Sequence, residues 1–409
     1  MAQRHDFPPP RYEPAGPGGA PAALAEGPAR PGPSAWPGGQ GRPGVPSGSP
    51  LTGHTAGEVL AAYLHHQSTE FLRSLRAHRD SGPDAEGARE AARHLRSASR
   101  RIGGALHTFR PLADEKWADH LRGELAWLSG TLAREHAGTA RLDRLMGALQ
   151  RLTGRGEREP GAGQARNSTR TANSAPTAHS APTANSVSSG PDQADLGEAA
   201  ATLSAGAARA GALLERQITL ARTRAHSAAL QALGSSRFHA VADAVAVLAS
   251  EAPLTAAADQ PATEVLPPLA EQAHRRLAEA VAALPLARAA HPYNADALAS
   301  DSRQDAPWHQ VRLLARLSRY AQEVTDPDDA DPRLDEACRA LERHRDAAEA
   351  AAATAAAART PRIAPATAYA LGVLHADQRH EVEAARFVFG RIWLHGQPPE
   401  QGPAVRKGH

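Results

Sequence analysis

The sequence predicts an all-α fold, and three observations support this prediction. Between residues 54 and 395, apolar side chains recur three and four positions apart over most of the chain, which is the periodicity of amphipathic helices. The sequence lacks the apolar–polar alternation that is typical of β-strands. Two segments also repeat one arginine pattern at helical spacing, which predicts two helical bundles related by a pseudo-two-fold duplication.

The first predicted bundle covers residues 54–152. Its second helix is basic, and we expect this helix to end near Arg110, because Pro111 disfavours helical backbone in the residue before it. Two more helices follow, one continuing through Leu132 and a further one that contains Leu142.

The second predicted bundle covers residues 195–395. Its helices are expected, in order, at about residues 195–233, 236–250, 265–284, 307–324, 333–359 and 367–393. Within the fifth of these, alanine dominates residues 347–358, so helix propensity alone favours a helix there.

Three segments lack the apolar residues needed for a core. Residues 1–53 are rich in Pro, Gly and Ala and predict a disordered tail. Residues 153–194 are of low complexity, with the hexad of residues 171–176 repeated almost unchanged, and predict a flexible linker between the bundles. Residues 396–409 form a short tail.

The composition excludes several classes of protein. No apolar run is long enough to span a bilayer, and the amino-terminal segment has no apolar core typical of a signal peptide. The single cysteine, Cys338, excludes an intrachain disulfide and a metal site with several cysteine ligands. We therefore expect a soluble, cytoplasmic chain without a membrane partner.

Two rows of basic residues are the candidate functional residues. The first row contains Arg89, Arg93, Arg96 and Arg100, and the second contains His309, Arg312, Arg316 and Arg319, with Tyr320 next in sequence. Arg89 and Arg312, Arg93 and Arg316, and Arg96 and Arg319 are each 223 positions apart. On a helix each row forms one stripe roughly 60° wide. Because guanidinium groups bind phosphate oxygens in a bidentate manner, two similar rows predict a site for one extended anionic ligand.

The first row borders the apolar face of its helix, so its arginines are expected at the edge of a core, where a groove between helices would lie. Glu90 is expected to point away from the row, and Glu86 is the clearest acidic neighbour. The alternative is a solvated cationic face, or arginines paired with acids of neighbouring helices. The acids considered for such pairs are Glu115, Asp119 and Glu124.

The residues resemble a known family. Residues 88–97, 109–112 and 117–130 are similar to the first half of a CHAD domain, the conserved histidine α-helical domain, and residues 309–321 resemble its second histidine/arginine helix. Residues 58–64 resemble the opening helix, and residues 370–374 and 387–393 the closing helices. The resemblance implies two bundles related by a pseudo-two-fold axis, with a basic cavity that binds inorganic polyphosphate.

The residues that match the family's basic positions are Arg89, Arg93, Arg96, His309, Arg312, Arg316 and Arg319. The chain differs from the family pattern at four positions. Glu86 stands where the first histidine is expected, Leu317 where a second basic residue is common, and His136 and Ala137 replace an Arg–Asp pair. A carboxylate at position 86 would repel phosphate and weaken binding.

Other chemistries have weaker support in the sequence. The histidines lack metal-ligand spacing, and His94 and His107 are interpreted as helix-edge residues. No phosphate-binding loop or nucleophile motif occurs, so we predict no catalytic residues, metal or cofactor. The prediction is a non-catalytic polyphosphate-binding protein that associates with polyphosphate granules. The alternative is a helical scaffold for protein or nucleic-acid interaction.

Overall fold

The computed structural model describes residues 51–81, 85–156, 191–290, 302–328 and 331–395. Within these ranges the regular elements are helices, and extended pairing is limited to isolated bridges. The predicted all-α fold is confirmed. Residues 1–50 of the predicted amino-terminal tail, the carboxyl-terminal tail and most of the predicted linker lie outside the described residues. The last residues of the predicted amino-terminal tail are described, and there the prediction is wrong, because Leu51 is buried in an apolar core.

Five helices form the first part of the fold. They are α1 (Ala56–Asp80), α2 (Ala85–Thr108), α3 (Glu115–Gly156), α4 (Pro191–Leu233) and α5 (Ser236–Leu248). A capping box starts α1, because the Thr55 side chain accepts from the backbone N–H of Glu58 and the Glu58 carboxylate accepts from the backbone N–H of Thr55. Helix α2 ends at Thr108, two residues before the predicted end near Arg110, and the chain then turns through a short 3-10 segment that contains Pro111.

In the second part, the described residues form five helices. They are α6 (Ala262–Ala282), α7 (Leu286–Ala289), α9 (Ala306–Thr325), α10 (Pro332–Ala358) and α11 (Pro365–His395). Prolines stand in the first turn of α9 and at the start of α10, where the missing N–H costs no helical hydrogen bond. The Asp331 side chain caps α10 by accepting from the backbone N–H of Arg333 at 2.9 Å.

The structure joins two predicted helices into one. Residues through Leu132 and the segment that contains Leu142 belong to a single α3 of 42 residues. The helix continues because buried residues of its second half, such as Leu145 and Leu149, pack with α4, α10 and α11. At their far ends α3 and α4 extend into the segment that the sequence assigned to the linker.

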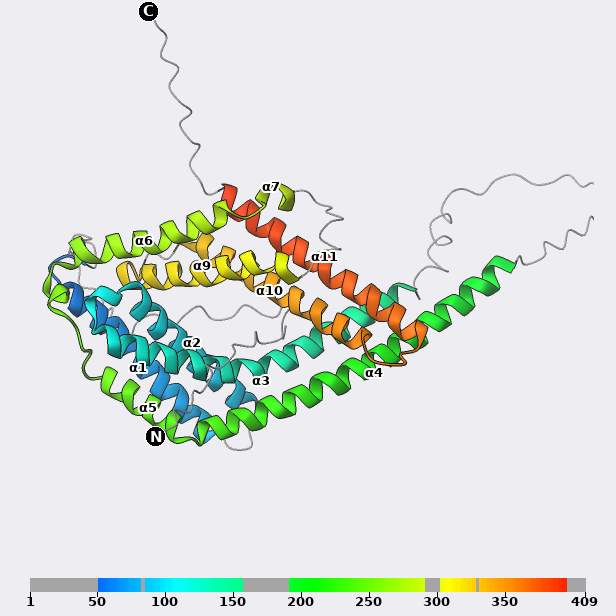
Figure 1. Ribbon diagram of the computed structural model, residues 1–409, viewed down its shortest axis with the longest axis horizontal. Coiled ribbons are helices and arrows are strands. Elements are labelled where there is room, and N and C mark those ends of the chain that lie inside the picture. The colour runs from blue at the N-terminus through cyan, green and yellow to red at the C-terminus, as the bar shows by residue number, and fades with distance from the viewer. Residues whose placement is uncertain (1–50, 82–84, 157–190, 291–301, 329–330, 396–409) are drawn as a thin grey trace, which may run out of the picture.

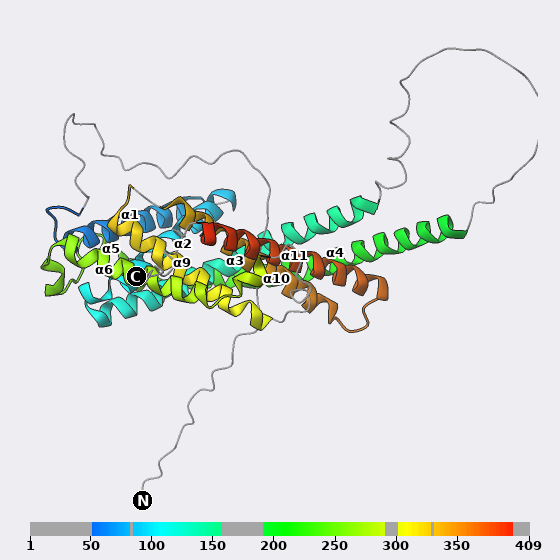
Figure 2. The same ribbon diagram turned by 90° about the horizontal axis from the view of Figure 1, so that it is seen from above.

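The long helices α3 and α4 run side by side, and their far ends extend beyond the other helices (Figures 1 and 2). One apolar core joins α1, α2, the first half of α3, α5 and the start of α6. A second core joins the end of α6 with α7, α9, α10 and α11. The first core takes residues from helices of both predicted bundles, such as Phe238 of α5 and Ala321 of α9. The division of the chain into bundles of residues 54–152 and 195–395, with a pseudo-two-fold relation between them, stays a prediction.

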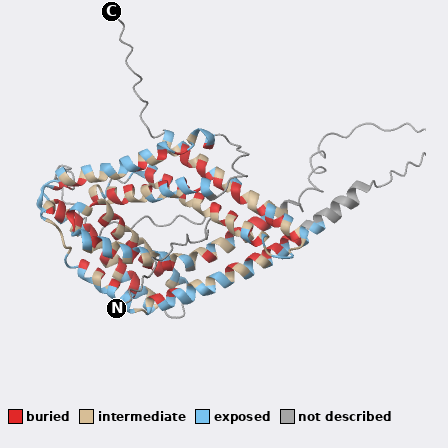
Figure 3. Ribbon diagram, viewed as in Figure 1, coloured by how far each residue is buried: buried red, intermediate tan, exposed pale blue. Residues whose placement is uncertain are grey.

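A third apolar cluster packs the long helices α3 and α4 against α10 and α11. Buried side chains lie on the sides of the helices that face one another, and the outer sides are exposed (Figure 3). In the described ranges, no helix combines the length and the apolar character needed to cross a membrane.

Helices α2 and α9 are in direct contact. Gly104 of α2 lies against the ring of Tyr320, and a Cβ atom at position 104 would be 2.5 Å from Tyr320 Cδ2. One turn away, Arg101 donates two hydrogen bonds to Glu323 of α9, Nε to Oε2 at 2.7 Å and Nη2 to Oε1 at 3.2 Å. The Tyr63 hydroxyl of α1 donates to the same carboxylate at 3.0 Å. A glycine and an ion pair therefore set the distance between α2 and α9.

This contact predicts opposite effects for two neighbouring glycines. Gly104→Ala should lower the free energy of unfolding by about 1–3 kcal/mol, because Tyr320 must move to admit the methyl group. Gly103→Ala has open space at its Cβ position and should raise stability by up to about 1 kcal/mol through helix propensity. Urea unfolding followed by circular dichroism measures both changes. Equal effects of the two substitutions would contradict the assigned contact.

Candidate functional site

Helix α2 carries the first predicted row. Its apolar face contains Leu95, Ile102 and Leu106, all fully buried, and this burial fixes the rotation of the helix. Arg96 and Arg100 border that face and are partly buried, whereas Arg89 and Arg93, nearer the start of the helix, are exposed. The expectation that the row follows the edge of the core thus holds for its second half.

Helix α9 carries the second row. Val311 and Ala315 are buried in the second core, and Ala321 and Val324 in the first. Arg312 and Arg316 lie one turn apart beside this face, with side chains 13% and 16% exposed. Two arginines of α9 are therefore held close to the protein interior.

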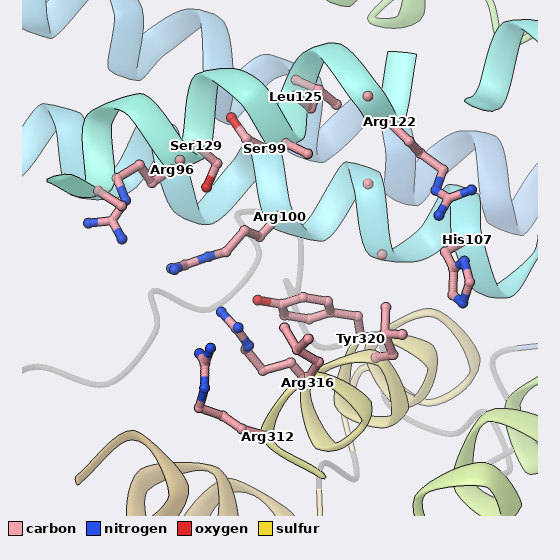
Figure 4. A pocket seen from close by; sticks show the side chains of 18 of the residues that line it. Arg96, Ser99, Arg100, His107, Arg122, Leu125, Ser129, Arg312, Arg316 and Tyr320 are labelled. Carbon is pink, nitrogen blue, oxygen red and sulfur yellow. The ribbon is translucent and has the colours of Figure 1, made fainter. Parts of the chain in front are cut away.

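A cavity of about 820 Å³ lies between α2, α3, α9 and α10. Six arginines line it: Arg96 and Arg100 from α2, Arg122 from α3, Arg312 and Arg316 from α9, and Arg345 from α10. Arg100 of α2 and Arg316 of α9 point toward each other across the cavity (Figure 4). The structure thus brings two parts of the chain that are more than 200 residues apart to one site.

The α2 wall of the cavity has uncompensated charge. In the described part of the chain, neither Arg96 nor Arg100 forms an ion pair with an acidic side chain, and the Nε atom of each is buried without a hydrogen-bond partner. Burial, together with repulsion from Arg100, Arg345 and Arg316, lowers the pKa of Arg96 to about 10. The positive charge on this wall therefore favours the binding of an anion.

The opposite wall contains one carboxylate among three arginines. Glu342 of α10 pairs with Arg312 at 3.1 Å, with Arg345 at 3.6 Å and with Arg316 at 3.9 Å. Burial alone would raise the pKa of Glu342, but the three guanidinium groups lower it to about 2. Glu342 is thus ionised at neutral pH and orders the arginines that line this wall.

Three acidic residues were considered as alternative partners of the first row. In the structure they form ion pairs with other arginines. Glu115 and Asp119 pair with Arg110, and Asp119 also pairs with Arg122. Glu124 pairs with Arg237 of α5. The hypothesis that these three acids neutralise the first row is wrong. The expectation for Glu90 is also wrong, because it pairs with Arg93 one turn away and with His94.

Four residues of the two predicted rows do not line the cavity. Arg89 and Arg93 lie on the exposed first half of α2. Arg319 pairs with Asp335 of α10 at 2.8 Å. His309 packs edge-on against the buried His344, with ring centroids 5.6 Å apart, and burial and then Arg312 lower its pKa. The five that do line it are Arg96, Arg100, Arg312, Arg316 and Tyr320.

Sequence reasoning missed three basic residues of the cavity, namely Arg122, Arg345 and His107. Arg122 and Arg345 belong to helices with no repeated row, so only the packing of α3 and α10 brings them to the site. His107 was interpreted as a helix-edge residue, and its signal was its position seven residues after Arg100, two turns further along the row. Among the residues that the structure describes, no group of three or more His, Cys, Asp or Glu side chains is arranged to hold a metal ion.

Known proteins similar to this chain agree with this architecture. The CHAD domain profile matches residues 66–332, which is more than half of the chain. The chain belongs to the CHAD family. The chain is similar to PptA from Streptomyces chartreusis, with which it shares 53% sequence identity. The solved structure of PptA matches this structure with a TM-score of 0.63, and the match covers 83% of this chain and 100% of PptA. No curated protein matches the chain. The CHAD protein is thereby a member of a polyphosphate-associated family.

The Glu342 cluster predicts a pH-dependent contribution to stability. Glu342→Gln leaves three arginines without their shared carboxylate. Because Glu342 is 37% exposed and solvent screens it, the expected loss at pH 7 is about 1–2 kcal/mol, below the loss for a fully buried pair. The folded-state pKa lies below the ordinary value of 4.5, so this stabilisation is present above about pH 4.5 and disappears as the pH falls toward about 2.

Urea unfolding of the wild type and of Glu342→Gln at pH 7 and at pH 3.5 to 4 measures this difference. Glu336→Gln, at an exposed acid of the same helix, is the control and should change stability little at either pH. The free energy of unfolding should differ less between the wild type and Glu342→Gln in acid than at neutral pH. If this difference is the same at both pH values, the assigned ion pairs are contradicted.

Proposed function

We propose that this CHAD protein binds inorganic polyphosphate in the cavity between α2, α3, α9 and α10, without catalysing a reaction on it. The observation that carries the proposal is the convergence of Arg96 and Arg100 with Arg312 and Arg316 from opposite walls. Such a concentration of like charge destabilises a folded protein unless an anion neutralises it. Family membership supports the same ligand.

The chemistry of the cavity suits a flexible chain of phosphates. Guanidinium groups form bidentate, charge-assisted hydrogen bonds with phosphate oxygens, and arginines on two walls can contact successive phosphates of one chain. Each contact releases counter-ions, so the affinity should fall steeply as the salt concentration rises.

Nucleic acid is a less suitable ligand. Sequence-independent binding of single strands uses exposed aromatic rings on which bases stack. Of the described residues that line the cavity, Tyr320 is the one with a phenyl-type ring, and it is 3% exposed because it packs against Gly104. The cavity therefore offers phosphate contacts without a stacking surface for bases.

The polar side chains beside the arginines favour binding over catalysis. Hydrogen bonding to Arg110, with the charges of Arg110 and Arg122, lowers the pKa of Asp119, which makes this carboxylate a poor general base. The Ser99 hydroxyl donates to the Leu95 carbonyl at 2.7 Å and is not paired with a base.

We expect the protein to act in the cytoplasm and to associate with polyphosphate granules.

A binding assay with long-chain polyphosphate, in the presence and absence of single-stranded DNA, tests this function. The double variant Arg96→Gln with Arg316→Gln should weaken binding roughly 100-fold, because it removes two charge-assisted contacts from opposite walls. The matched control, Arg89→Gln with Arg93→Gln, removes the same charge from the exposed part of α2 and should bind almost like the wild type.

The outcome separates the proposal from its alternatives. Equal competition by DNA would favour a general polyanion or nucleic-acid site. No binding of the wild type at low salt would reject polyphosphate binding and favour the alternative of a helical scaffold for protein partners. Equal losses in the two double variants would mean that total charge, not the cavity, determines the affinity.

A further inference from the structure

Helix α9 presents apolar side chains to the cavity beside its arginines. Leu313 follows Arg312 and Leu317 follows Arg316, so the two leucines form a second row along the helix next to the arginines. Leu313 lines the cavity and is 46% exposed. Leu317 reaches α2, where a Cβ atom at position 104 would be 3.5 Å from its Cδ2 atom. A ligand held by the arginines of α9 therefore also meets an apolar surface.

The α3 wall of the cavity continues this apolar surface. Beyond Arg122, the described α3 residues that line the cavity are uncharged and mostly small, namely Gly123, Leu125, Ala126, Ser129, Gly130 and Ala133. A Cβ atom at position 123 or 130 would have no neighbour within 4 Å. At a rise of 1.5 Å per residue, this wall extends about 15 Å along α3. The cavity thus has open space beside an uncharged wall.

Polyphosphate binding does not explain the apolar lining. Every phosphorus of that chain carries charged oxygens, and placing them against apolar side chains costs free energy because no hydrogen bond replaces those to water. Among the described residues, the other large exposed apolar side chains lie on α4, α5 and α11 and outside the cavity; they are Leu220, Leu230, Val247, Tyr369 and Leu394. Leu313 therefore belongs to the cavity and not to an outer apolar face that could lie on a bilayer.

We infer that the cavity also binds soluble organic phosphates that carry an aliphatic chain, with the phosphate on Arg100 and Arg316 and the chain against Leu313 and the uncharged α3 wall. The two arginines point toward each other across the cavity (Figure 4), so a phosphate between them accepts hydrogen bonds from both. The chain leaves water for an apolar lining, which adds affinity in proportion to the area that it buries. This inference goes beyond polyphosphate binding and does not depend on it.

The cavity favours an aliphatic chain over an aromatic group. The ring of Tyr320 is 3% exposed and packs against Gly104, so it offers no face for stacking. At about 1.5 Å per C–C bond, an eight-carbon chain extends less than about 12 Å, which is shorter than the α3 wall. The cavity volume of about 820 Å³ lies within the range of small-molecule sites, about 300–1,000 Å³. An alkyl phosphate with eight carbons is therefore a suitable probe.

Titration calorimetry of the full chain with butyl phosphate and octyl phosphate tests this inference. Each fully buried methylene group increases the affinity roughly fourfold, so octyl phosphate should bind at least about tenfold more tightly even if its added surface is only half buried. Octyltrimethylammonium has the same chain with a positive charge, and it should bind at least about tenfold more weakly than octyl phosphate. Equal affinities for butyl and octyl phosphate would overturn the inference.

Leu313→Asn tests the apolar part of the site. Because Leu313 is half exposed, this variant should fold, and it should reduce the preference for octyl over butyl phosphate about fivefold. Its affinity for polyphosphate should stay within about twofold of the wild type, since polyphosphate has no apolar group. The matched control is Leu220→Asn, at a leucine of α4 that is 50% exposed and lies outside the cavity. A preference for octyl phosphate that is the same in both variants would reject the assigned lining.

Arg316→Gln tests the position of the phosphate. It should weaken butyl and octyl phosphate alike, by about tenfold, and leave the preference between them unchanged, because it removes a charge-assisted hydrogen bond that both ligands make. Arg89→Gln, on the exposed part of α2, is the control and should change neither affinity. If Arg316→Gln binds octyl phosphate as tightly as the wild type does, the phosphate lies elsewhere and the inference is wrong.

The results separate this inference from the proposed function. If the wild type binds octyl phosphate but not polyphosphate, the proposed function is rejected and the inference stands. If it binds polyphosphate without preferring octyl to butyl phosphate, the inference is rejected and the proposed function stands. Sedimentation with phosphatidylcholine vesicles that contain phosphatidic acid tests a membrane source of the same chemistry. Recruitment to these vesicles that is lost in Leu313→Asn would reject the soluble ligand in favour of a membrane lipid.

Discussion

The contact between α2 and α9 is the constraint on which the site depends. Arg101 and Glu323 form a bidentate ion pair across it, and the ring of Tyr320 lies against the backbone at Gly104. A partly buried ion pair contributes little net stability, because desolvation offsets much of the Coulomb attraction. Its effect here is geometric. It fixes the register of the two helices, and this register determines which arginines of each row face the other across the cavity.

A second polar contact fixes the other end of α9. Asp305, just before this helix, accepts hydrogen bonds from Arg379 at 2.8 Å and from Arg386 at 2.6 Å, and all three side chains are buried. Arg386 also lies over the ring of Trp308, 5.1 Å from its centroid. Because α9 is held at its start by α11 and near its end by α2, Arg312 and Arg316 between these contacts have little freedom to move apart when no anion is bound.

The arginines on the two walls of the cavity differ in whether an acidic side chain pairs with them. Arg312, Arg316 and Arg345 share the carboxylate of Glu342, which limits the cost of bringing them together. Arg96 and Arg100 have no comparable acid in the described residues, and repulsion adds to burial in lowering the pKa of Arg96. Stability is thus reduced where an anion would bind, as is common for functional sites.

The sequence by itself determined the helices and the chemistry of the candidate site, because both depend on local periodicity. The spacing of apolar residues and the positions of prolines predicted α2 and α9 to within a few residues, and the arginine spacing identified Arg96, Arg100, Arg312 and Arg316 as a group. The resemblance to CHAD domains also came from sequence. Only the tertiary structure decided that Arg89 and Arg93 lie away from the cavity, and that Arg122 and Arg345 join it. The reason is physical: a row of arginines has the same spacing along its whole helix, but the partner helix crosses it at one place, and that place depends on distant contacts such as Gly104 with Tyr320.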